Sequence, residues 1–296
     1  MTDAVVRRFG VTPADRIGHG GDATVYALSG DRVLRVLHSP ASPIARIAAF
    51  YDELAGQDPG FALPRVLEHG EIDGTAYSID RLMPGRPLID MLPELTGDLR
   101  RRALDAYLDG AGAIGTLRIE RSLYGEVLAD PPLQCSTWTA FLLDRAAAAL
   151  AKSSGRLAAD VADFDEVVTA VRGLLASLAQ QVERRLVHGD YFPGNVMMGD
   201  DLAVSGVLDF GTLTVMGDTA MDVASAIIFI EVVPAGGPKD AAYLTALAVR
   251  TRGTTFVELL RAYRAYYALR LAPYAEADDP RLYAWCVRTL EAIERT

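Results

Sequence analysis

The segment over residues 186–196 sets a carboxylate and a carboxamide five residues apart, in a stretch too rich in Gly and Pro to be helical. These groups are Asp190 and Asn195, and a third oxygen-bearing side chain, Asp209, ends a short apolar run fourteen residues after Asn195. Carboxylate and amide oxygens are hard ligands of the kind Mg²⁺ prefers, and a separate exposed Asp can orient and deprotonate a hydroxyl group. Three such groups on two neighbouring loops suit a phosphoryl-transfer site. The alternative interpretation is that Asp and Asn lie here because they favour turns.

A second segment, over residues 17–26, is rich in glycine and continues into strand-like sequence. Its glycines are Gly18, Gly20 and Gly21. A Gly-rich turn between strands lets backbone N–H groups come close to phosphate oxygens. The segment is not a dinucleotide-binding fingerprint, because that fingerprint requires a helix after the glycines. A glycine loop that leads into a strand, with a basic residue on the next strand (here Arg35), is the arrangement of protein kinases.

Two regions of different character must position these side chains. The first 80 residues read as short strands separated by turns. Two β-prone runs, 23–28 and 32–37, are joined by a three-residue turn, and one helix is expected over about 43–55. Two further strands are expected over 63–68 and 75–82. The N-terminal region is therefore predicted to be mostly antiparallel sheet with one helix.

After Met83-Pro84-Gly85 the sequence becomes mainly helical. The clearest helix spans 164–186, where apolar residues recur at i, i+3, i+4 and i+7, and we expect Asp163 and Glu166 to cap its start as a pair. The other helices of this region are expected over 99–117, 138–151 and 255–271. The predicted fold class is α+β and bilobal, with a small antiparallel-sheet lobe over residues 1–82 and a larger, mainly helical lobe over residues 83–296.

Composition narrows the possible classes of protein. The 296 residues carry 29 Lys and Arg against 39 Asp and Glu, a net charge of −10, and half of them are hydrophobic, which rules out a disordered chain. The negative net charge argues against a general nucleic-acid binder. The apolar run over 223–230 is shorter than the roughly 20 residues that span a bilayer, and residues 1–10 lack the apolar run of a signal peptide. We therefore expect a cytoplasmic protein with neither nucleic acid nor membrane as a partner.

Three motifs, taken in order and spacing, resemble the aminoglycoside phosphotransferase family, whose members are small-molecule kinases with the protein-kinase-like fold. The resemblance covers nearly the whole chain and is specific to the superfamily rather than to a substrate. The matching motifs are His188-Gly189-Asp190 with Asn195, then Leu208-Asp209-Phe210, then Gly217-Asp218 with Asp222-Val223-Ala224.

The resemblance implies a role for each motif residue. Asp190 would be the catalytic Asp that positions the acceptor hydroxyl and takes its proton. Asn195 and Asp209 would hold the Mg²⁺ ions that bridge the nucleotide phosphates, the nucleotide being ATP or GTP. Three further residues would support the catalytic loop structurally: His188, Asp218 and Asp222.

The small lobe would hold the nucleotide. By the same resemblance, the three glycines would form a flap over the phosphates, and Arg35 would anchor the α- and β-phosphates. The backbone at the end of the last small-lobe strand would hold the adenine or guanine edge, at Asp80, Arg81, Leu82 and Met83.

The anchoring residue departs from the family pattern, which usually has Lys at this strand position. The chain contains only two lysines, Lys152 and Lys239, and both lie in the predicted large lobe, so no small-lobe lysine can replace Arg35. Arginine keeps the charge and can contact phosphate in a bidentate manner, so we interpret Arg35 as functional.

The acidic partner expected on the small-lobe helix is also missing. Alignment of Phe50-Tyr51 with the family's helix places Ile47 at the position of the usual Glu. Asp52 or Glu53 could serve only if the helix is shifted, which leaves the partner of Arg35 open.

The acceptor is predicted to be a small, hydroxylated, cationic molecule, with an aminoglycoside or a related antibiotic favoured. The alternatives are a metabolic kinase for choline, ethanolamine, homoserine or a sugar, and a nucleotide-binding pseudokinase. Tyr124-Gly125-Glu126 followed by Trp138 resembles a subgroup that includes hygromycin-type phosphotransferases. The chain is expected to act as a monomer or a homodimer. Acidic residues that could line the acceptor cleft are Asp144, Glu231, Glu258, Glu276, Asp278 and Asp279, while Tyr263, Tyr266 and Tyr267 are predicted to be core.

Overall fold

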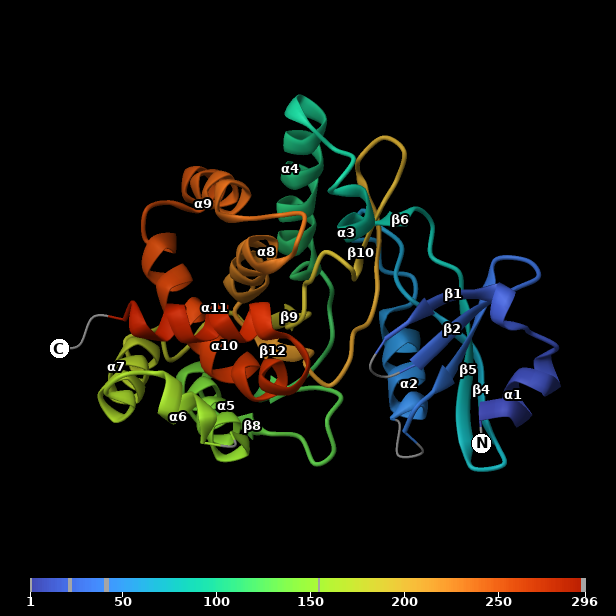
Figure 1. Ribbon diagram of the computed structural model, residues 1–296, viewed down its shortest axis with the longest axis horizontal. Coiled ribbons are helices and arrows are strands. Elements are labelled where there is room, and N and C mark those ends of the chain that lie inside the picture. Colours follow the sequence, from blue (N-terminus) through green and yellow to red (C-terminus); the bar gives the residue numbers. More distant parts are fainter. Residues whose placement is uncertain (1, 21–22, 40–42, 154, 294–296) are drawn as a thin grey trace.

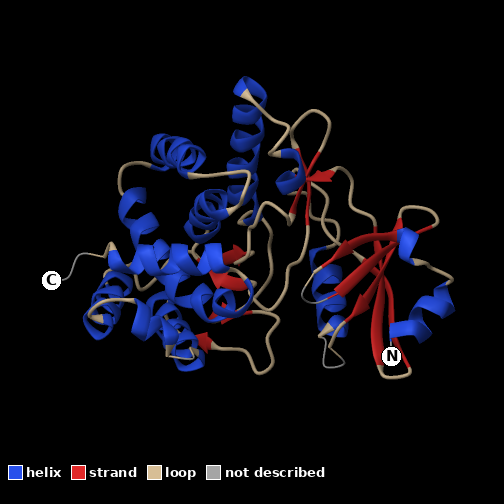
Figure 2. Ribbon diagram, in the orientation of Figure 1, coloured by secondary structure: helices blue, strands red, loops and turns tan. Residues whose placement is uncertain are grey.

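The chain folds into two lobes of different composition. Figure 1 shows the N-terminus in the smaller lobe and the C-terminus at the far side of the larger one. Strands dominate the smaller lobe and helices the larger (Figure 2), as the sequence predicts. The computed structural model describes residues 2–20, 23–39, 43–153 and 155–293.

The small lobe is built on one antiparallel sheet of five strands in the order β1-β2-β3-β5-β4. The three-residue turn between β2 and β3 forms as predicted, whereas the strand expected over 63–68 starts later, at Val66. The strands are β1 (Arg16–His19), β2 (Ala23–Leu28), β3 (Arg32–Leu37), β4 (Val66–Ile72) and β5 (Thr75–Arg81).

The two faces of this sheet pack on different helices. Leu34, Val36 and Ile79 form a buried cluster with Val5 of helix α1 (Thr2–Phe9), a helix that the sequence analysis did not predict; a short 3₁₀ turn, η1 (Pro13–Asp15), follows it. Side chains alternate between the faces of a strand, so the residues between these positions project from the opposite face. That face packs on α2 (Ile44–Leu54), and Ile44 lies in a buried cluster with residues of β2, β3 and β5.

Helix α2 also packs on the large lobe. Phe50, Tyr51 and Leu54 are buried in the main core cluster together with large-lobe residues, and the Phe50 ring lies 6.1 Å from that of Phe210. The Tyr51 hydroxyl donates to the Phe210 carbonyl at 3.4 Å. The helix therefore joins the sheet to the larger lobe (Figure 1).

The large lobe surrounds α8, an almost wholly buried helix. Eleven of its residues are buried, because its apolar residues continue around the whole circumference rather than forming one stripe. In the described part of the chain, no helix is both long and apolar enough to cross a bilayer. The helices are α3 (Leu88–Met91), α4 (Gly97–Ile114), α5 (Trp138–Lys152), α6 (Arg156–Asp160), α7 (Phe164–Ala176), α8 (Ala220–Val232), α9 (Pro238–Arg252), α10 (Phe256–Asp278) and α11 (Pro280–Glu291).

One predicted helix is shorter than expected. Helix α7 ends at Ala176 rather than at residue 186, because the following chain is held by α5 and β7: Gln180 accepts from the Trp138 backbone, and Val182 donates to the Tyr124 hydroxyl. The predicted capping pair was also wrong. The Asp163 side chain makes no cap hydrogen bond at the start of α7; its carbonyl accepts from the backbone of Glu166 instead.

Two small sheets flank the loops that carry Asp190 and Asp209. One has the order β11-β10-β6 and the other the order β8-β7-β12-β9, and every pairing in both is antiparallel. Their strands are β6 (Arg86–Pro87), β7 (Tyr124–Glu126), β8 (Gln134–Cys135), β9 (Arg185–Val187), β10 (Val196–Met198), β11 (Val204–Val207) and β12 (Val215–Gly217).

Candidate active site

The segment that contains Asp190 runs from β9 to β10 and is held from below by α8. The backbone N–H groups of His188 and Gly189 donate to the two carboxylate oxygens of Asp222, at 2.7 and 2.9 Å. Gly189 has a φ of +77°, and a Cβ there would lie 2.0 Å from the Leu213 carbonyl oxygen, so this position requires glycine. We call residues 188–195 the Asp190 loop.

Strand register brings Asn195 and Asp209 together. β10 pairs with β11, with Val196 opposite Val207, and the Leu208 N–H donates to the Asn195 carbonyl at 2.7 Å. Asp209 follows directly, so its carboxylate lies at the same end of the hairpin as Asn195. The Asn195 Nδ2 donates to the Asp190 carbonyl at 3.0 Å and lies 3.4 Å from the Asp190 carboxylate. All three residues predicted to carry the chemistry are therefore brought to one place.

Asp209 has an unusual backbone conformation. Its φ is +57°, in the left-handed region, which Asp tolerates better than most residues. Its side chain is 52% exposed, in contrast to the buried Phe210 that follows it. Backbone strain of this kind clusters at functional sites.

His188 is fully buried and links both loops. Its Nε2 donates to the Leu208 carbonyl at 2.7 Å, while its Nδ1 accepts from the Asp190 N–H at 3.2 Å, which together fix the tautomer. The ring contacts the Phe210 ring, with centroids 4.6 Å apart. The imidazole is buried between the two loops, and both of its ring nitrogens hydrogen-bond to backbone groups.

Helix α10 supplies supports that the sequence analysis missed. The Tyr267 hydroxyl and the Arg270 Nη1 both donate to the Gly189 carbonyl, at 3.2 and 3.1 Å. The Tyr263 hydroxyl donates to Asp218 at 2.7 Å and accepts from the Trp138 indole at 3.0 Å. Tyr263, Tyr266 and Tyr267 are buried, as predicted, but Tyr263 and Tyr267 also hold polar groups of the site. Tyr266 and Tyr267 follow Tyr263 by three and four residues, a spacing that puts them on the same helix face. This spacing was the sequence signal that could have indicated a shared role.

Arg35 lies between two carboxylates. Its guanidinium is 3.6 Å from the Asp80 carboxylate and 3.2 Å from that of Asp209, so the residue predicted to anchor phosphates faces one of the predicted metal ligands. Burial alone would lower the pKa of Arg35, but Asp209 and Asp80 raise it above its usual value. Burial raises the pKa of Asp80, and the neighbouring Arg35 offsets only part of that rise.

The other residues predicted to hold the nucleotide lie at the end of β1 and at the end of β5. Gly18 is in β1 and Gly20 follows that strand, with its N–H donating to Ala23, while Gly21 lies outside the described residues. At the end of β5, the N–H groups of Arg81 and Leu82 already donate to Arg65 and Asp31. No acceptor for the N–H of Met83, the last residue of this set, occurs within the described parts of the chain.

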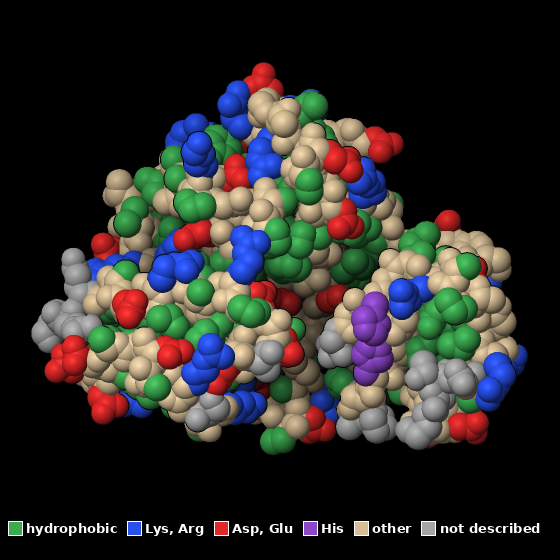
Figure 3. All heavy atoms as spheres, viewed as in Figure 1, with side chains coloured by type: hydrophobic (Ala, Val, Ile, Leu, Met, Phe, Trp, Pro, Cys, Tyr) green, Lys and Arg blue, Asp and Glu red, His purple; other side chains and the backbone are tan. Residues whose placement is uncertain are grey.

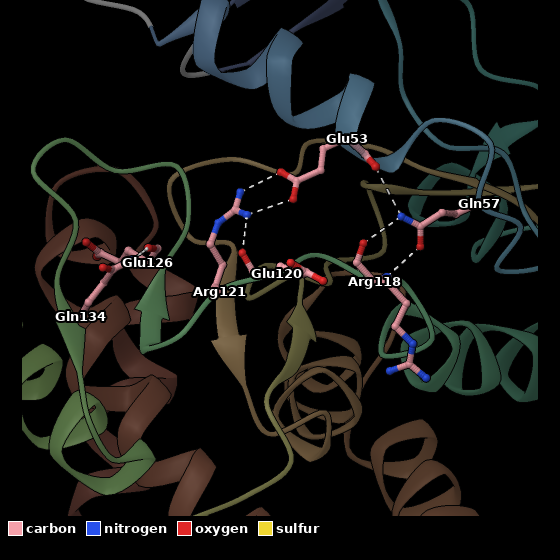
Figure 4. A network of polar contacts seen from close by, with 7 residues as sticks. All are labelled: Glu53, Gln57, Arg118, Glu120, Arg121, Glu126 and Gln134. Atoms are coloured by element: carbon pink, nitrogen blue, oxygen red, sulfur yellow. Dashed lines mark hydrogen bonds and ion pairs between the residues drawn. The ribbon is translucent and has the colours of Figure 1, made fainter.

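The acidic side chains of α2 do not pair with Arg35. Glu53 accepts two hydrogen bonds from Arg121 at 2.9 and 2.7 Å, and Gln57 both donates to and accepts from the backbone of Arg118, at 2.9 and 2.7 Å (Figure 4). Asp52 is exposed, and Ile47 packs against the main core. The shifted-helix arrangement in which Asp52 or Glu53 meets Arg35 is absent from the described residues.

Several acids considered for the acceptor are already engaged. Glu231 forms an ion pair with Arg264, the Asp144 carboxylate accepts from the Cys135 thiol at 3.5 Å, and Asp279 caps the start of α11. Glu258 and Asp278 are exposed.

Glu126 of the Tyr124-Gly125-Glu126 motif is buried. Its carboxylate lies 3.2 Å from the Arg145 guanidinium and accepts from the Leu133 N–H at 2.8 Å, while its carbonyl accepts from Gln134, which is drawn beside it in Figure 4. On the face shown in Figure 3, a hollow separates the lobes and acidic side chains lie at its floor.

A magnesium site would use few protein ligands here. Among the described residues, no group of three or more His, Cys, Asp or Glu side chains is arranged to hold a metal. Mg²⁺ is usually held by one or two protein oxygens together with substrate phosphates and waters. Asp209, half exposed, and the Asn195 Oδ1, which lies opposite the amide nitrogen that binds Asp190, fit that donor set.

Asp222 makes the stability of this site dependent on pH. Burial raises the pKa of Asp222 to about 6, against the opposing effects of His188 and the two backbone N–H groups. Between pH 4 and 6 the folded chain therefore binds a proton that the unfolded chain releases, so this group's stabilising effect is lost as the pH rises through that window. A difference of roughly two pKa units corresponds to about 3 kcal/mol.

We expect Asp222→Asn to remove this dependence. We subtract the variant's free energy of unfolding from that of wild type, both measured by urea denaturation. This difference should fall by about 3 kcal/mol from pH 4 to pH 6.5, because only the wild type loses stability. Asp200→Asn, an exposed change in the β10–β11 turn, is the control and should track wild type throughout. A wild-type-to-variant difference that stays constant with pH would contradict the expectation.

A family model and a sequence search compare this chain with known proteins. The model of the phosphotransferase enzyme family matches residues 14–266. No curated protein matches the chain in a sequence search.

Solved structures with the same fold cover nearly the whole chain at low identity. A thermostable mutant of aminoglycoside phosphotransferase APH(4)-Ia, in its apo form, is 20% identical, with a TM-score of 0.75 and coverage of 99% of this chain and 98% of that one. The streptomycin–ATP–APH(2")-IIa ternary complex is 14% identical, with a TM-score of 0.65 and coverage of 97% and 94%. A putative fructosamine-3-kinase from Haemophilus somnus 129PT is 14% identical, with a TM-score of 0.62 and coverage of 99% and 96%. The fold is thus that of protein-kinase-like phosphotransferases.

Proposed function

The chain belongs to the phosphotransferase enzyme family, and on that premise we propose that it is a magnesium-dependent kinase that transfers the γ-phosphoryl group of ATP or GTP to a hydroxyl group of a small molecule. The observation that carries the proposal is the gathering of Asp190, Asn195 and Asp209 at one end of a hairpin, with the Arg35 guanidinium 3.2 Å from Asp209. Residues 1–82 would form the nucleotide lobe, and residues 83–296 would carry the catalytic and acceptor sites.

In the proposed mechanism, Asp190 accepts the proton of the acceptor hydroxyl while the hydroxyl oxygen forms a bond to the γ-phosphorus. The bond from the γ-phosphorus to the β,γ-bridging oxygen breaks, which releases the nucleoside diphosphate. Asn195 keeps the Asp190 carboxylate in place through its Nδ2, and the Asp222–backbone hydrogen bonds hold the loop beneath. The chain's contribution is mainly positioning and charge stabilisation, because the transition state is loose.

The remaining polar groups would serve the nucleotide. Asn195 and Asp209 would hold Mg²⁺, which when bound neutralises charge on the β- and γ-phosphates. Arg35 would contact the α- and β-phosphates as a bidentate donor. The glycine loop after β1 would cover them, and the backbone near Met83 would meet the base.

We propose an aminoglycoside or a related hydroxylated antibiotic as the acceptor. The likeness to aminoglycoside phosphotransferases over nearly the whole chain and the acidic floor of the hollow between the lobes support this choice. A metabolic small-molecule kinase is the second candidate, and the similarity to the putative fructosamine-3-kinase favours it. With identities of 14% to 20% in these comparisons, fold alone does not choose between them.

An acceptor screen tests the proposal. The assay measures γ-phosphoryl transfer with Mg²⁺ and either ATP or GTP to pools of aminoglycosides, other hydroxylated antibiotics, choline, homoserine and sugars including ketosamines. We expect transfer to an antibiotic, and loss of that transfer in Asp190→Asn. Transfer to a metabolite alone would establish the second candidate. Nucleotide binding without transfer to any pool would point to a pseudokinase.

A further inference from the structure

Strand register places a carboxylate beside Arg35 from within the sheet itself. β3 and β5 are antiparallel neighbours, with Arg35 opposite Ser78 and Val33 opposite Asp80. Arg35 and Asp80 are therefore a diagonal pair on one face, and such pairs lie within reach of long side chains. Leu34, Val36 and Ile79 lie on the other face with α1, so Arg35 and Asp80 lie on the face that packs on α2.

Asp80 is a buried carboxylate whose charge depends on this pairing. The residue is 9% exposed, and its Oδ2 lies 3.6 Å from the Arg35 Nη1. Its other oxygen, Oδ1, is buried and has no hydrogen-bond donor in the described parts of the chain. A buried carboxylate of this kind is costly unless a cation stays beside it, so the position of Asp80 constrains the position of Arg35.

The other groups near Arg35 are less suited to hold it. Asp209 is half exposed and lies with Asn195 at the predicted metal position, so its carboxylate would be shared with the cation. Helix α2 places Tyr51, not an acid, near Arg35 and Asp209. Its Glu53 is held by Arg121 on the large lobe.

We propose that Asp80 is the positioning residue for Arg35, holding its guanidinium toward the nucleotide phosphates from the neighbouring strand of the sheet. This inference rests on the proposed function, because it assigns Arg35 to a nucleotide. It gives Asp80 a side-chain role in phosphate binding, distinct from the backbone role predicted for it at the base edge.

The test compares nucleotides with and without phosphates. Affinities of the full chain for Mg²⁺–ATP, Mg²⁺–GTP and adenosine are measured by calorimetry for wild type and Asp80→Asn. We expect the variant to bind the triphosphates about tenfold more weakly, the scale for one misplaced charge-assisted contact, and to bind adenosine as wild type does. Asp80→Glu, which keeps the charge, should recover part of the loss.

Two control variants test whether the effect is specific to Asp80. Asp52→Asn makes the same chemical change at an exposed site on α2, and Glu53→Gln removes the helix acid that is bound to Arg121. Both should bind the triphosphates with wild-type affinity. A loss in Glu53→Gln equal to that in Asp80→Asn would move the role to the helix and overturn the proposal.

A double-variant cycle shows whether Asp80 acts through Arg35. Asp80→Asn should add nothing to the loss of ATP affinity in Arg35→Ala, and the double variant should melt no lower than Arg35→Ala alone, since removal of both partners leaves no unpaired buried charge. This melting comparison holds even where Asp80→Asn alone folds poorly.

Three results overturn the inference: wild-type ATP affinity in Asp80→Asn, equal losses of ATP and adenosine affinity, or additive losses in the double variant. A wild-type chain that binds no nucleotide would instead remove the proposed function itself, together with what rests on it.

Discussion

Asp190→Asn is expected to lower kcat by about 10²- to 10⁴-fold, the range for loss of a general base. The variant keeps the shape of the side chain, so the Asn195 amide and the loop hydrogen bonds to Asp222 can persist. What it loses is the group that accepts the proton of the acceptor hydroxyl. The measurement is steady-state transfer to the acceptor found in the screen, with nucleotide affinity measured in parallel.

The nucleotide affinity of this variant separates chemistry from binding. Because Asp190 would meet the acceptor and not the nucleotide, the Kd for Mg²⁺–ATP should stay within about twofold of wild type, or about 0.4 kcal/mol. Asp200→Asn, the same change on the exposed turn after β10, should leave both kcat and Kd unchanged. Turnover near that of wild type in Asp190→Asn would remove Asp190 from the proposed mechanism.

Asp209→Asn is expected to lower kcat by about 10²- to 10³-fold, the range for loss of one preorganised electrostatic group. It should also raise the Mg²⁺ concentration that gives half-maximal activity, because an amide oxygen carries no net charge for the cation. Asn tolerates the left-handed backbone that Asp209 adopts, so the change tests the charge and not the fold. Activity is measured across a Mg²⁺ series at saturating ATP.

Asp73 offers a matched control for Asp209. It also has a positive φ, of 49°, and is exposed in the turn between β4 and β5, far from the Asp190 loop in sequence. Asp73→Asn should leave the Mg²⁺ dependence as in wild type. An Asp209→Asn variant with an unchanged Mg²⁺ requirement would argue that this carboxylate serves Arg35 alone.

Local sequence was enough to predict that the candidate residues on neighbouring short segments lie close together. Asp190 and Asn195 lie in one loop, and Asp209 follows within a single hairpin, so spacing along the chain already implied spacing in space. The sheet-rich and helix-rich regions were predictable for the same reason, because the period of apolar residues is a local signal.

Contacts between distant segments were not predictable in this way. The pairing of Arg35 with Asp80 needs the register of two strands separated by a helix and another strand, which no local pattern specifies. The support of Gly189 by Tyr267 and Arg270 joins residues about 80 positions apart. Helix α7 ends early because of partners on α5 and β7, an effect of tertiary contacts on a sequence that would otherwise continue as helix.

The packing of α2 has a consequence for how the chain comes apart. Phe50, Tyr51 and Leu54 belong to the core of the large lobe, and Glu53 and Gln57 are tied to the segment before β7. The five-stranded sheet with α1 has its own smaller cluster on the far face. We therefore expect the cooperative units of partial unfolding not to follow the lobe boundary in the sequence. In amide hydrogen exchange, most of α2 should share the protection of the helical lobe, while the sheet opens as a separate unit.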